Sequence, residues 1–195
     1  INAEQVEKIR QKYGAKRGYT KEEDLLADPE VDAVYIATPI VLHAKQAKLA
    51  ADYGKDILIE KPLAMTSDEG QAVIDYCERK GVKIAAGFMM RFGSHVMSMK
   101  KAIAEGKIGT VVSGYSQFTL WLPYEPGNWR QCKAKAGGGA MMDLGAHPMY
   151  LSAWMLGNPV RIQSMFTNKT GHAVEDNSIS TIEFEGGAIA VSETS

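Results

Sequence analysis

The stretch Ile57-Leu58-Ile59-Glu60-Lys61-Pro62-Leu63 contains a short apolar run that ends abruptly at an acid, a lysine and a proline. Three consecutive apolar residues are typical of a buried strand in a parallel sheet. Pro62 lacks an N–H group and disfavours helical geometry at the preceding residue, so the strand must end there. Lys61 is therefore predicted to lie at the carboxyl end of a strand, where open α/β sheets bind ligands. The alternative is an ordinary solvated surface lysine.

Outward from this stretch, strand-like and helix-like segments alternate with short links. The predicted strands are the apolar runs 31–37, 57–59 and 82–87. The predicted helices are 3–13, 22–27, 43–53, 66–80 and 92–105. Asn2 and Gly14 flank the first helix in the positions of an N-cap and a C-terminal stop. The alternation predicts a Rossmann-like, doubly wound parallel sheet, here incomplete.

The pattern changes after Gly106, where β-type segments follow one another directly. The predicted elements are a long β run at 108–122, a helix at 140–156, and strands at 160–168, 178–185 and 188–194. Glu185-Gly186-Gly187 is a predicted hairpin turn. An α+β domain with a mostly antiparallel sheet is expected, which divides the chain into domains 1–107 and 108–195.

The composition is that of an ordinary globular protein, with 45% hydrophobic residues and a net charge of −1. A net charge this close to zero gives no excess of basic residues that would favour binding to nucleic acid or to an anionic membrane. No apolar run approaches the roughly 20 residues of a membrane helix. Cys77 and Cys132 are far apart and form no CxxC motif. They are predicted to be reduced thiols of a cytoplasmic protein, and no metal site is expected.

A second motif, Asp143-Leu144-Gly145-Ala146-His147, places an acid and an imidazole four residues apart, on one face of a predicted helix. The preceding Gly137-Gly138-Gly139 allows a ligand or another backbone to approach closely. An Asp/His pair on a helix is commonly a surface hydrogen bond. Beside Lys61, however, it fits the oxidation of a secondary alcohol, because a histidine of pKa near 6.5 can accept the hydroxyl proton.

Taken together, these motifs resemble the Gfo/Idh/MocA family, which includes glucose–fructose oxidoreductase and inositol dehydrogenase. The resemblance covers essentially all of the chain, in order and at the expected spacing. It rests on Ala37-Thr38-Pro39, His43, Glu60-Lys61-Pro62, Met90-Arg91-Phe92, Gly137-Gly138-Gly139, Asp143 and His147.

The resemblance implies an NAD or NADP cofactor and assigns roles to individual residues. The implied catalytic group is Lys61, Asp143 and His147, with His147 as the acid/base. The implied cofactor-binding residues are Thr38, Pro39, His43, Glu60, Lys61, Pro62 and Arg91. The implied substrate-binding residues are Lys61, Trp129, Arg130, Asp143 and His147.

Two assignments stay open at this point. Arg91 is expected either near the cofactor or in a structural salt bridge at the domain junction. Trp121, Tyr124 and Trp129 are candidates to stack on a sugar ring, although Trp121 is also a candidate for core packing.

The chain departs from the family pattern in three ways. The G-x-G-x-x-G turn and the strand carrying the ribose-binding acid are missing, so the residue that selects NAD or NADP is missing too. Tyr150 stands where many relatives carry an acid. The second sheet stops short of the family's length. The chain is therefore expected to be a piece of a longer protein, with an exposed sheet edge and weak cofactor binding on its own.

The function implied by the resemblance is hydride transfer between NAD(P) and a secondary hydroxyl of a sugar, polyol or cyclitol. One alternative is an NAD-dependent glycosidase of the same fold, and another is a non-catalytic regulator that senses sugars or nucleotides. The expected partners are a sugar or polyol and further copies of the chain. A dimer or tetramer would form through the sheet of the second domain, with no nucleic acid and no membrane involved.

Overall fold

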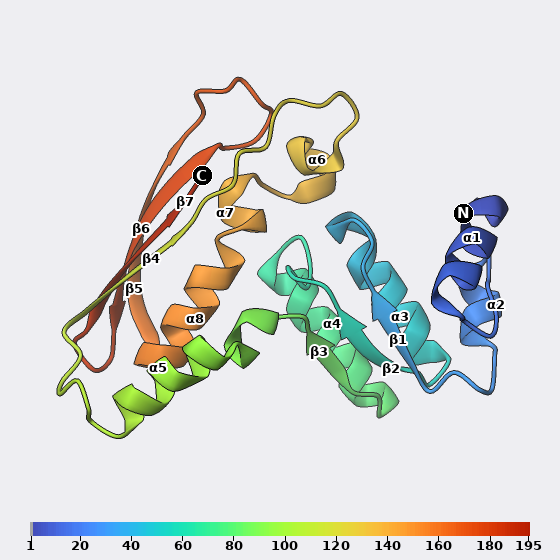
Figure 1. Ribbon diagram of the computed structural model, residues 1–195, viewed down its shortest axis with the longest axis horizontal. Helices are drawn as coiled ribbons and strands as arrows, with labels where there is room; N and C mark the ends of the chain where they lie inside the picture. Colours follow the sequence, from blue (N-terminus) through green and yellow to red (C-terminus); the bar gives the residue numbers. More distant parts are fainter. Residues whose placement is uncertain (1) are drawn as a thin grey trace.

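The computed structural model describes residues 2–195, which form two sheets with their own helices (Figure 1). Sheet A has three parallel strands in the order β1-β2-β3. They are β1 (Ala33–Ile36), β2 (Asp56–Ile59) and β3 (Ile84–Ala86). The helices of this part are α1 (Ala3–Tyr13), α2 (Glu22–Leu26), α3 (His43–Asp52) and α4 (Ser67–Lys80). The predicted parallel sheet is confirmed.

Helix ends in this part follow the capping residues of the sequence. The Asn2 side chain accepts a hydrogen bond of 3.2 Å from the Gln5 N–H at the start of α1. Thr66 caps α4 in the same way. Gly14 and Gly81 close these two helices in the left-handed conformation, with φ of 64° and 70°.

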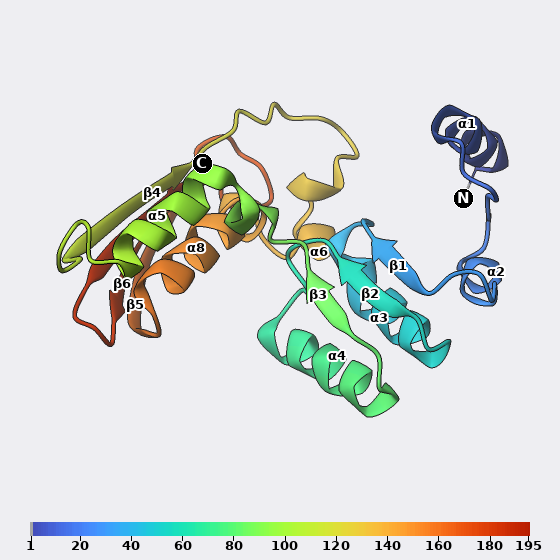
Figure 2. The ribbon, with the colours of Figure 1, turned by 60° about the horizontal axis from the view of Figure 1, so that its bottom comes forward.

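Helices cover only one face of sheet A within residues 2–195. α3 and α4 lie on one face of sheet A (Figure 2). Ile57 and Ile59 are buried in one cluster with Ala47 of α3 and Val73 of α4. Leu58, on the opposite face, is 45% exposed, and its neighbour Tyr35 is 58% exposed. The prediction that the whole apolar run is buried is therefore wrong for Leu58, because no described element packs on that face.

β2 ends where the proline predicts. The Glu60 N–H donates to the Ile36 carbonyl, at 2.8 Å, and the Lys61–Pro62 peptide bond that follows is cis. The Gly87 N–H donates to the Ile59 carbonyl, at 2.7 Å. Lys61 thus lies at the carboxyl edge of the parallel sheet, as predicted.

Sheet B has four strands in the order β4-β7-β6-β5. They are β4 (Ser113–Phe118), β5 (Pro159–Thr167), β6 (Asn177–Phe184) and β7 (Ile189–Thr194). β5, β6 and β7 are antiparallel, while β4 runs parallel to β7. The mostly antiparallel sheet is confirmed. The predicted β run 108–122 is too long, because β4 extends only as far as its partner β7 does.

One face of sheet B packs against α8 (Ala146–Leu156), and α5 (Ser94–Ala104) lies beside α8 in both views (Figures 1 and 2). The small core of this part joins Ile182, Phe184 and Ala190 to Met149 and Leu156 of α8. This packing fixes the helix that carries His147 against the sheet.

The predicted helix 140–156 is not continuous. It consists of α7 (Ala140–Asp143) and α8, separated at Leu144 and Gly145. Pro148 has no N–H to donate to the Leu144 carbonyl and its ring would crowd that carbonyl, so a regular helix cannot pass through. At Gly145, an added Cβ would overlap the Met141 carbonyl oxygen, which shows how tightly the chain bends there.

The remaining elements are too short to produce a periodic pattern in the sequence, and they were not predicted. They are α6 (Lys133–Ala136) and the 3₁₀ turns η1 (Ile40–Leu42), η2 (Met89–Phe92) and η3 (Trp129–Gln131). Among the helices of the described chain, none is both long and apolar enough to cross a membrane.

Candidate active site

An ion pair between Lys61 and Asp143 joins the two sheets at the carboxyl edge of sheet A. The Lys61 Nζ donates to the Asp143 carboxylate Oδ1, at 2.8 Å, and to its main-chain carbonyl, at 2.5 Å. Lys61 is largely buried and Asp143 is partly exposed. Because Asp143 is the last residue of α7, this hydrogen bond also satisfies a main-chain carbonyl at the end of that helix.

His147 lies in the first turn of α8 and is only 3% exposed. Its imidazole is wedged between Phe88, which follows β3, and Phe118, the last residue of β4. The ring centroids are 6.4 and 5.4 Å from that of His147, in edge-on geometry. Within residues 2–195, the buried Nδ1 atom has no hydrogen-bond partner.

The acid and the imidazole do not share a regular helix face, contrary to the prediction, because the chain breaks between them. Asp143 and His147 are not hydrogen-bonded to each other in the described chain. Asp143 acts on His147 through its charge rather than through a direct bond.

The pKa of His147 lies below its usual value of 6.5. Burial is the main cause, because it disfavours the charged imidazolium, and the nearby Lys61 charge lowers the pKa further. The Asp143 and Glu60 carboxylates oppose this shift. At neutral pH, His147 is therefore the neutral imidazole and is able to accept a proton.

Arg130 reaches the same carboxylate from the other side. Its Nε atom lies 3.3 Å from Asp143 Oδ2, and its guanidinium covers the Trp129 ring at 4.5 Å. Both residues belong to η3. The structure thus brings Lys61, Asp143 and Arg130 together, with the carboxylate held between two cations.

A cleft of about 570 Å³ opens beside Arg130 and Asp143. Trp121 lines this cleft and is 79% exposed, so the core-packing alternative for Trp121 is wrong. Lys169 and His172 also line the cleft. Cation, aromatic and carboxylate groups therefore surround one concave space next to the Lys61–Asp143 pair.

The other predicted cofactor residues lie in two turns at the same sheet edge. Thr38 and Pro39 follow β1, and Glu60 and Pro62 follow β2. His43, the first residue of α3, contacts both turns and is 1% exposed. Its Nδ1 lies 2.9 Å from the Pro62 carbonyl oxygen and its Nε2 lies 2.9 Å from that of Thr38. The role of His43 visible here is to link the two turns.

Arg91 forms no salt bridge with any residue of the described chain. Its guanidinium instead lies over the rings of Phe92, Tyr150 and Trp154, at 5.5, 5.6 and 4.9 Å. The salt-bridge alternative for Arg91 is therefore not supported, although its position at the domain junction is.

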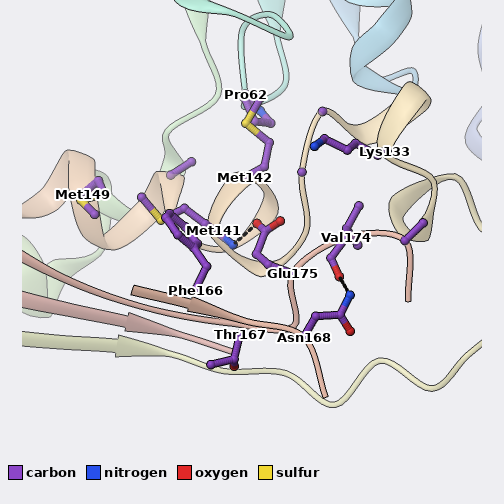
Figure 3. A pocket seen from close by; sticks show the side chains of 15 residues that line it. Pro62, Lys133, Met141, Met142, Met149, Phe166, Thr167, Asn168, Val174 and Glu175 are labelled. Carbon is purple, nitrogen blue, oxygen red and sulfur yellow. Dashed lines mark hydrogen bonds between the residues drawn. The ribbon is translucent and has the colours of Figure 1, made fainter. Parts of the chain in front are cut away.

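Glu175 is a site residue that the sequence analysis missed. Its carbonyl accepts the Ala140 N–H, at 3.1 Å, and its carboxylate accepts the Met141 N–H, at 3.2 Å (Figure 3). A Cβ added at Gly139 would overlap this carbonyl oxygen. Of the two alternatives for the triple glycine, the structure thus shows close approach of another backbone. The only signal in the sequence was the glycine run itself.

A second cleft, of about 790 Å³, lies on the far side of α7 (Figure 3). Its lining is mainly apolar and includes Met141, Met142, Met149 and Phe166. No group of three or more histidine, cysteine, aspartate or glutamate side chains suited to a metal ion is found between residues 2 and 195.

The fold and the site define a class: a Rossmann-type domain followed by an α+β domain, with a lysine, an acid and a histidine where the two meet. Residues 1–88 match the family model "Oxidoreductase family, NAD-binding Rossmann fold". Residues 96–195 match that of the "GFO/IDH/MocA C-terminal domain". The chain belongs to the Gfo/Idh/MocA family, which confirms the resemblance.

Curated relatives include sugar and cyclitol dehydrogenases. D-xylose 1-dehydrogenase (NADP(+)) 2 of Haloferax volcanii is 37% identical over 183 residues, covering 93% of this chain and 55% of the relative. The scyllo-inositol 2-dehydrogenase (NAD(+)) of Bacillus subtilis is 28% identical and covers 97% of this chain and 56% of the relative.

Among solved structures, a levoglucosan dehydrogenase in complex with NADH and levoglucosan superposes with a TM-score of 0.92 at 30% identity. The match covers 98% of this chain and 55% of that one. The chain spans about half the length of the relatives it matches.

Proposed function

We propose that the full-length protein is an NAD(P)-dependent dehydrogenase that oxidises a secondary hydroxyl of a sugar, polyol or cyclitol. The observation that carries this proposal is the Lys61–Asp143 ion pair beside a buried, neutral His147, at the carboxyl edge of a parallel sheet. The dehydrogenase activities named for the relatives support the reaction class.

The residues divide the chemistry between them. His147 accepts the hydroxyl proton, because burial keeps its imidazole neutral. Lys61 donates a hydrogen bond to the substrate oxygen and stabilises the negative charge that develops there. Asp143 orients Lys61 through the 2.8 Å contact and offsets its charge. Proton acceptance and charge stabilisation thus belong to different side chains.

The residues present fit a nicotinamide cofactor. The turns after β1 and β2 place Thr38, Pro39, Glu60 and Pro62 at the edge where open α/β sheets bind dinucleotides. The Nδ1 atom of His147, next to this edge, is a buried polar atom without a hydrogen-bond partner within residues 2–195. When bound, NAD or NADP supplies the hydride acceptor.

The substrate is proposed to occupy the cleft beside Arg130. Trp121 provides an aromatic surface suited to a sugar ring, and Trp129 holds the Arg130 guanidinium in place. Arg130 and Asp143 provide a donor and an acceptor for vicinal hydroxyls. This arrangement supports a polyhydroxylated substrate.

The decisive experiment measures reduced-nicotinamide formation by the full-length protein with NAD or NADP and a panel of aldoses, polyols and cyclitols. Changing Lys61→Ala should lower kcat by roughly 10²- to 10⁴-fold with the fold unchanged. Lys45→Ala, at an exposed position on α3, is the matched control and should retain full activity. Near-normal turnover by the Lys61 variant would contradict the catalytic assignment. Release of sugar from an aryl glycoside without net cofactor reduction would indicate the glycosidase instead.

Three further expectations remain proposals. The domain boundary is placed at 107/108, between the two sheets. The location is proposed to be cytoplasmic, supported by Cys77 and Cys132, both free thiols. The full-length protein is proposed to form a dimer or tetramer through the uncovered face of sheet B.

A further inference from the structure

One face of α8 is docked against the segment that links β3 to α5. This face carries His147, Tyr150 and Trp154, which are spaced three and four residues apart and so lie on the same side of the helix. The opposing segment runs from Phe88 through η2 into α5, beside α8 in the fold (Figure 1). The catalytic histidine is therefore the first of three side chains in a contact between the two domains.

The contact is made of stacked rings under a cation. The Phe88 ring stacks on Tyr150, with centroids 4.4 Å apart and planes inclined by 12°. The Arg91 guanidinium lies over the Tyr150 and Trp154 rings, at 5.6 and 4.9 Å. A guanidinium over two rings orders both of them, because each ring face attracts the charge. Phe88, Arg91 and Tyr150 are called the junction cluster below.

A hydrogen bond at the far end of the same helix fixes its position along the axis. The Lys100 Nζ donates to the Trp154 carbonyl, at 2.6 Å, and lies 5.6 Å from the Trp154 ring centroid. Lys100 belongs to α5, so the same continuous segment contacts α8 at both ends. α8 cannot slide or rotate without breaking these contacts.

His147 depends on such packing for its orientation. A catalytic imidazole is usually oriented by a hydrogen bond at its second nitrogen. Here the Nδ1 atom has no such partner within the described chain, and the edges of Phe88 and Phe118 enclose the ring instead. Phe88 contacts His147 with one edge and Tyr150 with its face. A Phe88 ring held in place by the junction cluster therefore holds the imidazole in one orientation.

We propose that the junction cluster is a positioning device that fixes the His147 imidazole against the carboxyl edge of sheet A. Arg91, Phe88 and Tyr150 are positioning residues: they contact the histidine or each other, and the proposal assigns them no contact with cofactor or substrate. This inference rests on the proposed function. It also gives Tyr150 a role that an acid could not fill, because only a ring can stack on Phe88.

The first test compares three variants of the full-length protein. Arg91→Leu removes the cation from the rings, Arg91→Lys restores a cation, and Arg79→Leu removes a similar contact with Tyr76 far from the site. For Arg91→Leu we expect kcat to fall roughly ten- to a hundredfold, because small displacements of a catalytic group are costly. The Kd for the reduced cofactor, from its fluorescence, should not change. Arg91→Lys should recover most of the rate, and Arg79→Leu should match the unchanged protein.

A weakened cofactor Kd with an unchanged kcat would overturn the proposal and make Arg91 a cofactor contact. Equal activity of Arg91→Leu and Arg79→Leu would overturn it as well.

The second test does not require activity. Nuclear magnetic resonance of histidine-labelled full-length protein reports the His147 Cε1–H signal, which the neighbouring ring currents shift. Tyr150→Leu should move this signal, whereas Tyr150→Phe, which retains the ring, should leave it nearly in place. An unmoved signal in Tyr150→Leu overturns the inference. If no sugar is oxidised but the signal moves as expected, the proposed function fails while the positioning role stands.

Discussion

His147 combines two properties that usually exclude each other: it is almost fully buried and yet it is ionisable. Burial lowers its pKa first, the Lys61 charge lowers it further, and Asp143 and Glu60 only partly compensate. In the unfolded chain the same group has its ordinary pKa, near 6.5. Above that pH both states are neutral and folding carries no penalty from this group. As the pH falls from about 6.5 through the folded-state pKa, the unfolded chain binds a proton more readily and stability is lost.

The same shift determines the pH dependence of the proposed reaction. Oxidation requires the neutral imidazole, so the acidic limb of the kcat/KM profile should have its midpoint below 6.5. His147→Ala should remove that limb and lower the rate roughly 10²- to 10⁴-fold. His95→Ala, at an exposed histidine of α5, is the control and should keep both limb and rate. An unchanged profile in the His147 variant would mean that another group transfers the proton.

Individual site residues were predictable where the local sequence constrains them. The position of Lys61 at the sheet edge was predictable because Pro62 ends β2 directly after it. Asp143 and His147 were singled out by their four-residue spacing, but the shared helix face expected from that spacing is absent. Glu175 was not found, because nothing near it in the sequence shows that its backbone passes Gly139. Contacts between distant segments are a property of the tertiary fold, which local patterns do not contain.

At the scale of elements, the break between α7 and α8 changes how the site is built. A continuous helix would have tied Asp143 and His147 to one rigid body. Instead, α7 is a single turn whose start is held by the Glu175 loop, and α8 is held by sheet B and the segment after β3. The acid and the histidine are therefore positioned by separate supports. The break could not be predicted from Pro148 alone. A proline at this position is compatible with a kink inside one long helix and equally with the first turn of a new helix.

This division predicts a specific sensitivity at Gly139. Changing Gly139→Ala forces a Cβ into the Glu175 carbonyl oxygen, so either α7 or the loop 168–176 must move. We expect a loss of roughly 1–3 kcal/mol in unfolding free energy, measured by denaturant titration of the full-length protein, together with reduced turnover. Gly186→Ala, where an added Cβ has no neighbour within 4 Å, is the matched control. Equal stability of the two variants would show that the loop 168–176 moves away from the added Cβ at no cost in free energy.

At the scale of the whole molecule, sheet B has an unusual distribution of side chains. The face toward α7 and α8 buries the hydroxyl groups of Ser178, Ser180 and Thr194. Ser178 pairs with Thr194, at 2.7 Å, and Ser180 pairs with the exposed Ser164, at 2.8 Å. The opposite face exposes Ile179 of β6, which alternates with these serines. The buried face of β6 also carries Ile182 and Phe184, so hydrophobic alternation indicates the correct face in that strand. In β7 it does not, because Ile189 and Val191 lie on the less buried face and Ala190, Ser192 and Thr194 on the covered one.

The uncovered face is proposed to be the surface through which copies of the protein associate. Side chains that the strand register places on this face include Tyr115, Met165, Ile179 and Ile189, all exposed. They come from all four strands and are called the apolar band; Met165 pairs directly with Ile179, while Glu193 and Glu183 lie beside Ile179 and Ile189 on the same face. An exposed sheet face with this many apolar side chains is suited to face-to-face packing with its own copy.

The prediction at this scale concerns the oligomeric state of the full-length protein. Changing Ile179→Glu places a charge in the middle of the band, where the proposed contact would bury it without a partner. We expect light scattering after size exclusion to show a dimer or tetramer for the unchanged protein and a smaller species for this variant. Ile108→Glu introduces the same charge at an exposed position before β4, outside the sheet, and should leave the mass unchanged. If Ile179→Glu retains the mass of the unchanged protein, the association surface lies elsewhere. A monomeric unchanged protein would contradict the proposed association itself.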